Sequence, residues 1–166
     1  NNGMAVYEMG PAATAIERSI MQWLGQRFGF EQAEGVMVSG GSLGNLTALL
    51  AARQLAGGDQ EGGVKGGIWK NGNPSKQKLA VMVSEEAHYC VGRAVQVMGL
   101  GEDAVIKVPS NEYLQMNTSQ LNKCYEMALS EGKKIFAIVG SACTTSTGSY
   151  DDLEAIAAFC QEKNLW

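Results

Sequence analysis

Three short segments of the sequence carry groups that could bind a ligand. Gly40, Gly41 and Ser42 form a glycine turn with one hydroxyl, His88 is the only histidine, and residues 144–147 are four consecutive hydroxyl residues. Each segment follows a short apolar run of the kind that forms a buried strand. Ligands of open parallel sheets bind beyond the carboxyl ends of the strands. The three segments therefore predict a site for a phosphorylated, planar, anionic ligand.

The glycine turn predicts a contact with an anion. The missing side chains at Gly40 and Gly41 let a ligand approach the backbone, and the amides at the start of the following helix carry partial positive charge. Ser42 adds a hydroxyl donor. The turn lacks the G-x-x-x-x-G-K-[ST] and G-x-G-x-x-G patterns of nucleotide-binding loops. A tight strand-to-helix turn without a ligand is therefore an equal alternative at this point.

The other polar residues at predicted strand ends also have structural alternatives. His88 could stack on an aromatic ligand or act as an acid or base, but by position alone a structural histidine that bonds the backbone is the more common case. We interpret residues 144–147 as a turn that bonds its own backbone. The pairs Glu85–Glu86 and Asp151–Asp152 are interpreted as helix caps. Cys143 is interpreted as a buried packing residue, because no nearby cation would activate its thiol.

The elements that position these residues alternate between strands and helices. Short apolar runs predict the strands, and apolar residues at helical spacing predict the helices. This alternation predicts an α/β fold, with a mainly parallel sheet and helices on both faces. We expect helices over residues 11–29, 43–54, 85–98, 117–132 and 151–160, strands at 35–39, 79–84, 105–109 and 135–140, and the beginning of another strand at 165–166. Residues 57–73 contain seven glycines and predict a mobile surface loop.

Composition excludes several classes of function. With 166 residues, 45% hydrophobic and 18% charged, the chain has the content of one ordinary globular domain. The net charge of −4, without a block of basic residues, argues against nucleic acid as a partner. The apolar runs are too short to cross a bilayer, so no membrane partner is expected. The four cysteines are widely spread without a C-x-x-C pair, which argues against a metal site and for a reducing cytoplasm. Because the chain begins with Asn1 and without a signal pattern, we expect it to be a fragment of a longer protein.

Four stretches of the sequence resemble one known family. Residues 38–53, VSGGSLGNLTALLAAR, resemble the phosphate-binding segment of group II pyridoxal-phosphate-dependent amino-acid decarboxylases. Residues 84–94, SEEAHYCVGRA, are similar to the segment of that family whose histidine stacks on the cofactor ring. Residues 144–153 resemble its later threonine-pair segment, and residues 7–24 resemble its N-terminal stretch. The resemblance covers nearly the whole chain, in the family's order.

The resemblance implies a fold and a set of site residues. The fold would be part of the large domain of the aspartate-aminotransferase-like (fold type I) enzymes. Residues 1–34 would be a helical segment that contributes to the substrate pocket, and residues 35–166 a partial cofactor-binding domain. Gly41 and Ser42 would bind the phosphate of pyridoxal 5'-phosphate. His88 would stack on the ring as the catalytic residue of this chain. Thr145 would contact a cofactor oxygen, with Thr144 a near-equal choice.

Two positions depart from the family pattern. Cys143 stands where the family commonly has glycine, and Leu43 stands in place of the usual acidic residue. Neither change removes a proposed contact. The resemblance also implies that the aspartate for the ring nitrogen and the Schiff-base lysine lie after Trp166.

The implied activity is decarboxylation of an L-amino acid to its amine and CO2, by a carbon–carbon lyase. The opening stretch is most similar to that of decarboxylases of small acidic or diamino acids, and 2,4-diaminobutyrate is our first choice of substrate. Glutamate, cysteine sulfinate and aromatic amino acids remain open. The family further implies a homodimer. The alternatives are another reaction of the same fold, such as that of an aminotransferase or a desulfurase, or a non-catalytic domain that binds a phosphoanion.

Overall fold

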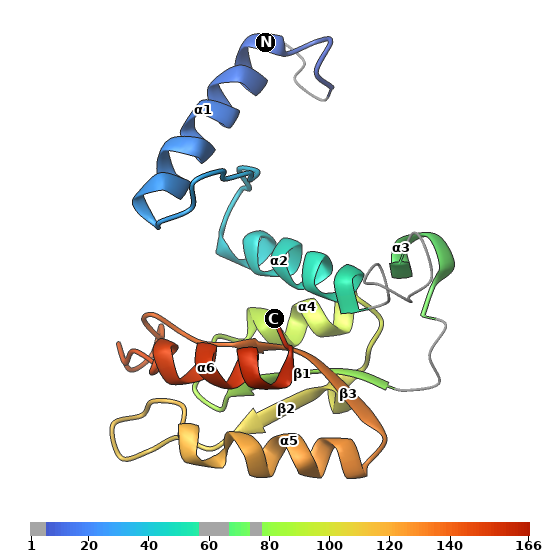
Figure 1. The fold of residues 1–166 in the computed structure, drawn as a ribbon, viewed down its shortest axis with the longest axis vertical. Coiled ribbons are helices and arrows are strands. Elements are labelled where there is room, and N and C mark those ends of the chain that lie inside the picture. The colour runs from blue at the N-terminus through green and yellow to red at the C-terminus, as the bar shows by residue number, and fades with distance from the viewer. Residues whose placement is uncertain (1–5, 57–66, 74–77) are drawn as a thin grey trace. The chain divides into compact units, whose positions relative to one another are not determined.

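The structure is a computed structural model that describes residues 6–56, 67–73 and 78–166. The chain divides into two compact units, Asn1–Gly44 and Asn45–Trp166 (Figure 1). Helix α2, Gly41–Ala56, begins in the first unit and continues into the second.

The first unit contains helix α1, Pro11–Arg27, close to the predicted range. Proline at the first helical position fits, because its fixed φ suits a helix start and its missing N–H has no partner there anyway. After the helix ends, the chain folds back so closely that a Cβ atom at Gly25 would lie 1.9 Å from the Cβ of Ala33. Only glycine therefore allows this close approach.

The strand predicted at residues 35–39 is wrong. The chain there is irregular, and Val36 and Met37 are exposed. The Met37 N–H donates to Glu17 Oε1 at 2.6 Å and so bonds a side chain of α1. A strand needs a neighbour for its backbone groups, and within the described ranges no segment pairs with this run. An apolar run by itself is therefore not enough to form a strand.

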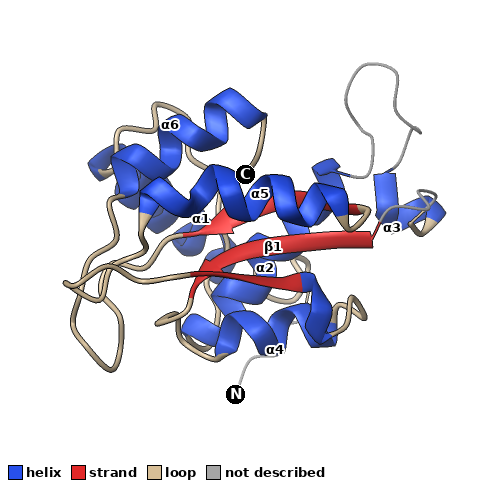
Figure 2. Ribbon diagram, turned by 90° about the horizontal axis from the view of Figure 1, so that it is seen from below, coloured by secondary structure: helices blue, strands red, loops and turns tan. Residues whose placement is uncertain are grey.

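The second unit contains a parallel sheet in the order β2-β1-β3 (Figure 2). Strand β1 is Lys78–Ser84, β2 is Val105–Val108 and β3 is Lys133–Val139, all at predicted positions. Trp166 adds a further step beside β3, since Trp166 N–H donates to Phe136 O at 3.1 Å and Ile138 N–H donates to Trp166 O at 2.8 Å. Residues 165–166 are not assigned as a strand, but these two bonds agree with the predicted direction of the chain along the sheet.

Helices cover both faces of this sheet, as predicted. Figure 2 shows α4, Cys90–Val97, on one face, and α5, Leu121–Ser130, and α6, Leu153–Lys163, on the other. The strand order explains the arrangement. The chain moves one way from β1 to β2 and the opposite way from β2 to β3, and right-handed crossovers in opposite directions place their helices on opposite faces.

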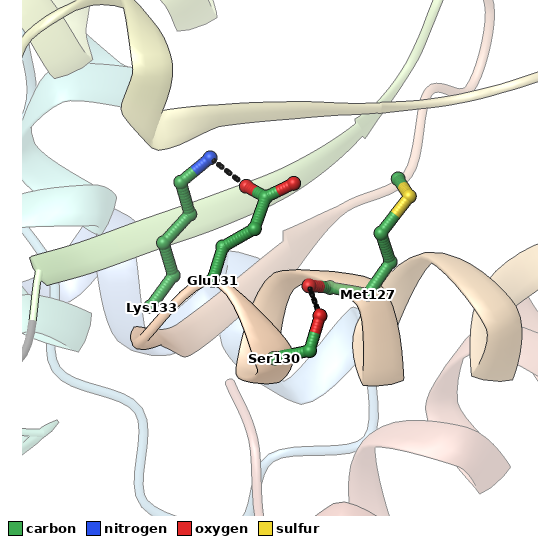
Figure 3. A network of polar contacts seen from close by, with 4 residues as sticks. All are labelled: Met127, Ser130, Glu131 and Lys133. Carbon is green, nitrogen blue, oxygen red and sulfur yellow. Dashed lines mark hydrogen bonds and ion pairs between the residues drawn. The ribbon is translucent and has the colours of Figure 1, made fainter.

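Three local signals explain where the helices of this unit begin and end. The Asn117 side chain accepts the Ser119 N–H at 3.2 Å before α5, and the Asp152 side chain accepts the Ala155 N–H at 3.0 Å at the start of α6, so both predicted caps are confirmed. Figure 3 shows how α5 leads into β3. The Ser130 hydroxyl donates to Met127 O at 2.7 Å, and Lys133 Nζ pairs with Glu131 Oε2 at 2.7 Å.

Two predicted ranges need correction. Residues 85–89 form a turn and not the first part of a helix, because the Glu85 N–H donates to Val108 O at 3.1 Å and extends pairing with the end of β2. Of the predicted mobile loop, residues 57–66 lie outside the described residues. Gly67–Asn71 form the short helix α3, in which Gly67 and Ile68 are buried. That part of the loop therefore packs.

The core of the second unit is centred on β1. Ala80, Val81 and Met82 are fully buried, as are Val95 of α4 and Val108 of β2. Burial on both faces fits the uninterrupted apolar run of β1. Two short 3₁₀ helices, Glu102–Ala104 and Thr118–Gln120, precede β2 and α5. Within the described part of the chain, no helix is both long enough and apolar enough to span a membrane.

Candidate functional site

The candidate site lies at the carboxyl ends of β1 and β3. The connection after β1 passes through α4 on one face of the sheet, and the connection after β3 passes through α6 on the other face. Neighbouring strands whose connections leave to opposite faces open a crevice between their carboxyl ends, where α/β proteins bind ligands. His88 follows β1, and Thr144 and Thr145 follow β3. The topology therefore places these predicted site residues on the two loops that flank the crevice.

His88 is half-buried in the turn between β1 and α4. Its ring centroid lies 4.2 Å from that of Tyr89, with the planes tilted by 37°. The Arg93 guanidinium lies over the ring of Tyr89, 4.8 Å from its centroid. A histidine supported by a neighbouring aromatic ring and still partly accessible can present its imidazole to a planar ligand.

The hydrogen bonds of His88 define where its proton lies. The Cys90 backbone N–H donates to His88 Nδ1 at 3.3 Å. A nitrogen that accepts a hydrogen bond cannot also carry the proton of the neutral ring, so the proton is assigned to Nε2. His88 therefore offers an Nε2–H donor and not a second acceptor.

The hydroxyl turn after β3 is held by its own hydrogen bonds. Thr144 is 3% exposed, and its hydroxyl bonds those of Thr147 and Ser149 while it accepts the Ser149 N–H at 3.2 Å. The interpretation of these residues as a self-bonded turn is thus confirmed for Thr144. Thr145 is exposed at the same turn, which leaves it better placed to meet a ligand.

Cys143, predicted to be buried, is exposed. The backbone of this turn directs the Cys143 thiol outward, toward the phenol of Tyr150. A hydrogen bond with the Cys143 thiol raises the pKa of Tyr150, which is itself exposed. Cys143 is therefore a surface residue of the turn and not a packing residue.

Carboxylates near the crevice mostly anchor loops. Asp151 is 5% exposed, and its oxygens accept the N–H groups of Met116 at 2.6 Å and Ser141 at 2.7 Å. Its interpretation as a helix cap is wrong, because Asp152 already caps α6. Glu85 is not a helix cap either, since its carboxylate accepts the Ser110 N–H at 2.8 Å. Asp151 and Glu85 therefore tie together the loops that follow different strands.

In the first unit, Gly41 and Ser42 are the first two residues of α2 and directly follow Gly40. A Cβ atom at Gly40 or Gly41 would meet no described atom within 4 Å, and neither glycine has a positive φ. Neither packing nor backbone conformation within the described residues therefore requires glycine here. The N–H groups of a first helical turn have no acceptor within the helix. Open space above such amides fits an anion that a side chain would exclude.

Two residues of α2 whose side chains contact α4, within the second unit, were not predicted from the sequence. The Asn45 side-chain amide donates to Cys90 Sγ at 3.1 Å, and Arg53 Nη1 donates to Met98 O at 3.2 Å. Asn45 and Arg53 lie within the family-like stretch 38–53, which was a signal that both have a role. No sequence pattern identified their partners.

Hollows in the surface lie in both units. One of about 410 Å³ is lined by Ser84, His88, Gly92 and Lys107, among others, within the roughly 300–1,000 Å³ of small-molecule pockets. A larger one of about 780 Å³ is formed within the first unit by α1 and residues 32–35, and contains none of the predicted site residues. Among the described residues, no group of three or more His, Cys, Asp or Glu side chains is placed to hold a metal ion.

Comparison with known proteins gives consistent results. A family model described as the pyridoxal-dependent decarboxylase conserved domain matches residues 1–166. An aromatic-L-amino-acid decarboxylase of Bacillus atrophaeus is 33% identical over 95% of this chain and 30% of its own length. An L-2,4-diaminobutyrate decarboxylase of Acinetobacter baumannii is 30% identical over 100% of this chain and 34% of its own length.

A solved structure agrees with these sequence matches. The glutamate decarboxylase domain of the Vibrio parahaemolyticus protein named diaminobutyrate-pyruvate transaminase and L-2,4-diaminobutyrate decarboxylase has a TM-score of 0.90 and 34% identity. The match covers 100% of this chain and 36% of that chain. The chain thus spans about a third of the length of the proteins that it matches.

Proposed function

The chain belongs to the pyridoxal-dependent decarboxylase family, and from this premise we propose that it forms part of an enzyme that binds pyridoxal 5'-phosphate and removes the carboxyl group of an L-amino acid as CO2. The observation that carries the proposal is the half-buried His88 at the carboxyl end of β1, with its proton assigned to Nε2. The bound cofactor would supply the electron sink for the pair released when the carbon–carboxyl bond breaks.

The residues of the chain fit such a cofactor. The glycine turn offers backbone amides, and no described atom lies within 4 Å of where a Cβ of Gly41 would be. That open approach supports the assignment of the phosphate to Gly41 and Ser42. The half-buried ring of His88 supports its role in stacking on a flat ligand and fixing its plane. The exposed Thr145 is the better candidate for a cofactor oxygen, since the hydroxyl of Thr144 is bonded inside its own turn.

His88 would act by orientation and by one proton. The Nε2–H, which lies in the plane of the imidazole, would donate a hydrogen bond to an anionic group of the ligand, while the backbone N–H of Cys90 occupies Nδ1. The loops that flank the crevice are fixed by the Asp151 and Glu85 carboxylates, so His88 and Thr145 would meet a ligand in prearranged positions. Prearranged groups lose little entropy on binding and need no reorganisation.

For the substrate we propose 2,4-diaminobutyrate or a small acidic amino acid. The named activity of the Acinetobacter baumannii relative supports this choice, whereas the aromatic activity of the Bacillus atrophaeus relative keeps aromatic amino acids as the competing possibility. We also propose that residues 1–34 line the substrate pocket. The test is amine analysis after incubation with each amino acid, and a preferred aromatic substrate would contradict the choice.

We further propose a cytoplasmic homodimer. Four free cysteines support a reducing compartment, and the family resemblance supports the dimer. Sedimentation at several concentrations tests the assembly, and a monomer at every concentration would contradict it. Fractionation of cells tests the location.

Spectroscopy of the full-length protein that contains this chain, with added pyridoxal 5'-phosphate, tests the central proposal, because the Schiff-base lysine is expected after Trp166 and the chain by itself should be inactive. We expect an absorbance band near the visible edge that borohydride abolishes, and an amine product from the preferred amino acid. His88→Ala should lower the rate of amine formation, because the ring plane loses its support. Trp69→Ala removes an exposed aromatic residue of α3 and serves as the matched control. A protein that stays colourless would overturn the proposal, and a keto acid product without CO2 would indicate another reaction on this fold.

A further inference from the structure

Helices α2 and α4 are linked by polar contacts at both ends. Within the second unit, Asn45 of α2 donates to Cys90 Sγ at the start of α4, and Arg53 of α2 donates to Met98 O at the end of α4. The partners of both pairs are 45 positions apart along the chain. The two helices therefore lie side by side and run in the same direction, with the Asn45 contact at the end nearer to His88.

Cys90 connects this helix pair to the imidazole. Its thiol is 3% exposed and accepts the Asn45 amide at 3.1 Å, while its backbone N–H donates to His88 Nδ1 at 3.3 Å. Because Cys90 is the first residue of α4, its N–H has no acceptor within the helix and needs one outside it. The ring nitrogen supplies that acceptor, so the position of Cys90 decides where the ring can lie.

We propose that Asn45 is a positioning residue for His88 and acts through Cys90. The Asn45 amide holds the Cys90 thiol, the first turn of α4 stays in place, and the Cys90 N–H keeps Nδ1 as an acceptor. The proton of the neutral ring then remains on Nε2. The effect of this proton position on a bound cofactor rests on the proposed function. The hydrogen bonds among Asn45, Cys90 and His88 do not depend on that function.

The sole histidine of the chain makes a direct test possible. With ¹⁵N-labelled histidine in the full 166-residue chain, the side-chain signals come from His88 alone. At a pH where the ring is neutral and without cofactor, Nδ1 should resonate as an acceptor nitrogen and Nε2 as a protonated one. In Asn45→Ala the two resonances should move toward each other, because both tautomers become populated. Asn45 is exposed, so this truncation leaves no cavity.

Three further variants separate positioning from packing. Cys90→Ala should move the resonances as Asn45→Ala does, whereas Cys90→Ser keeps a hydroxyl acceptor and should retain the wild-type shifts. Cys124→Ala removes a thiol of α5 that is 6% exposed, nearly as buried as Cys90. It should lower stability without moving the His88 signals, since Cys124 lies on another helix.

The proposal is overturned if Asn45→Ala leaves both resonances at their wild-type positions, or if Cys124→Ala shifts them equally. Failure of the proposed function would give a different experimental result. In that case the full-length protein that contains this chain would show no cofactor band on addition of pyridoxal 5'-phosphate, while the nitrogen shifts of the 166-residue chain, recorded without cofactor, would still follow Asn45 and Cys90.

Discussion

Individual polar residues around the crevice mostly bind backbone groups. The Asp151 carboxylate accepts two N–H groups, Glu85 accepts that of Ser110, and His88 Nδ1 accepts that of Cys90. The bonds Asp151–Met116 and Glu85–Ser110 join loops that are distant in the sequence, since their partners are 35 and 25 positions apart. Asp151 and Glu85, interpreted from the sequence as helix caps, therefore serve to hold the loops on which Thr145 and His88 lie.

We expect Asp151→Asn to destabilise the fold. One backbone N–H would face the NH2 of the new amide instead of a carboxylate oxygen, and hydrogen bonds to charged groups contribute about 1.5–3 kcal/mol each. A loss of that order should appear in the free energy of unfolding measured in urea. Asp152→Asn is the matched control, because asparagine and aspartate cap a helix about equally well. Equal losses in the two variants would contradict the assigned role of Asp151.

Gly41→Ala should separate stability from binding. A Cβ there meets no described atom within 4 Å, and alanine favours a helix over glycine by up to about 1 kcal/mol, so the melting temperature should stay or rise. The affinity for pyridoxal 5'-phosphate should fall at least about tenfold, which corresponds to 1.4 kcal/mol, as measured by absorbance titration.

Gly44→Ala provides the control for this prediction within the same helix. Its Cβ would lie at 3.4 Å from Val38 Cγ2, a tolerable contact. Stability should respond as for Gly41→Ala, and the affinity should not change. An unchanged affinity in Gly41→Ala would remove the phosphate assignment from the glycine turn.

Among the secondary-structure elements, the predicted strands that find a partner in the sheet agree with prediction. Strand β1 pairs with both β2 and β3, and Trp166 makes two further backbone hydrogen bonds with β3. The apolar run at residues 35–38 has the same composition but no partner within the described ranges, and it stays irregular. Local composition therefore selects candidates for strands, and pairing decides which of them form.

The contribution of the sheet edge at Trp166 can be measured with proline. Trp166→Pro removes the N–H that donates to Phe136 O, and a typical backbone hydrogen bond contributes about 0.5–1.5 kcal/mol net. We expect that additional loss relative to Trp166→Ala, which removes the same side chain and keeps the N–H. If both variants unfold at the same urea concentration, the edge contact contributes no stability.

The second unit as a whole depends on the burial of β1. This strand lies at the centre of the sheet, with helices on both faces, and Met82 on it is fully buried. Met127 on α5, which is labelled in Figure 3, is 53% exposed. The same residue type thus occupies the core at one position and the surface at the other.

These two methionines make a matched pair for testing the core. Met82→Ala should cost about 2–5 kcal/mol, because a buried side chain is replaced by a cavity. Met127→Ala should change the free energy of unfolding by less than about 0.5 kcal/mol, as is usual for surface positions. Similar effects in the two variants would show that the sheet is not the centre of stability. The free energy of unfolding of each variant, measured in urea, distinguishes these outcomes.

The amino-acid sequence alone predicted the alternation of strands and helices, the caps at Asn117 and Asp152, and the family. These features depend on residues near one another in the chain, through apolar periodicity, turn chemistry and side chains that bond the adjacent backbone. Motif resemblance also selected His88, Gly41, Ser42 and the threonine pair as the candidate site, whose roles in binding stay predictions.

Other features required the folded structure. The strand order β2-β1-β3 places His88 and the threonine pair after neighbouring strands. This order, the role of Asp151 as a loop anchor, the exposure of Cys143 and the Asn45–Cys90 contact all depend on residues far apart in the sequence. Such contacts form only when the sheet assembles, because each buried polar group then bonds whichever partner the fold brings within reach.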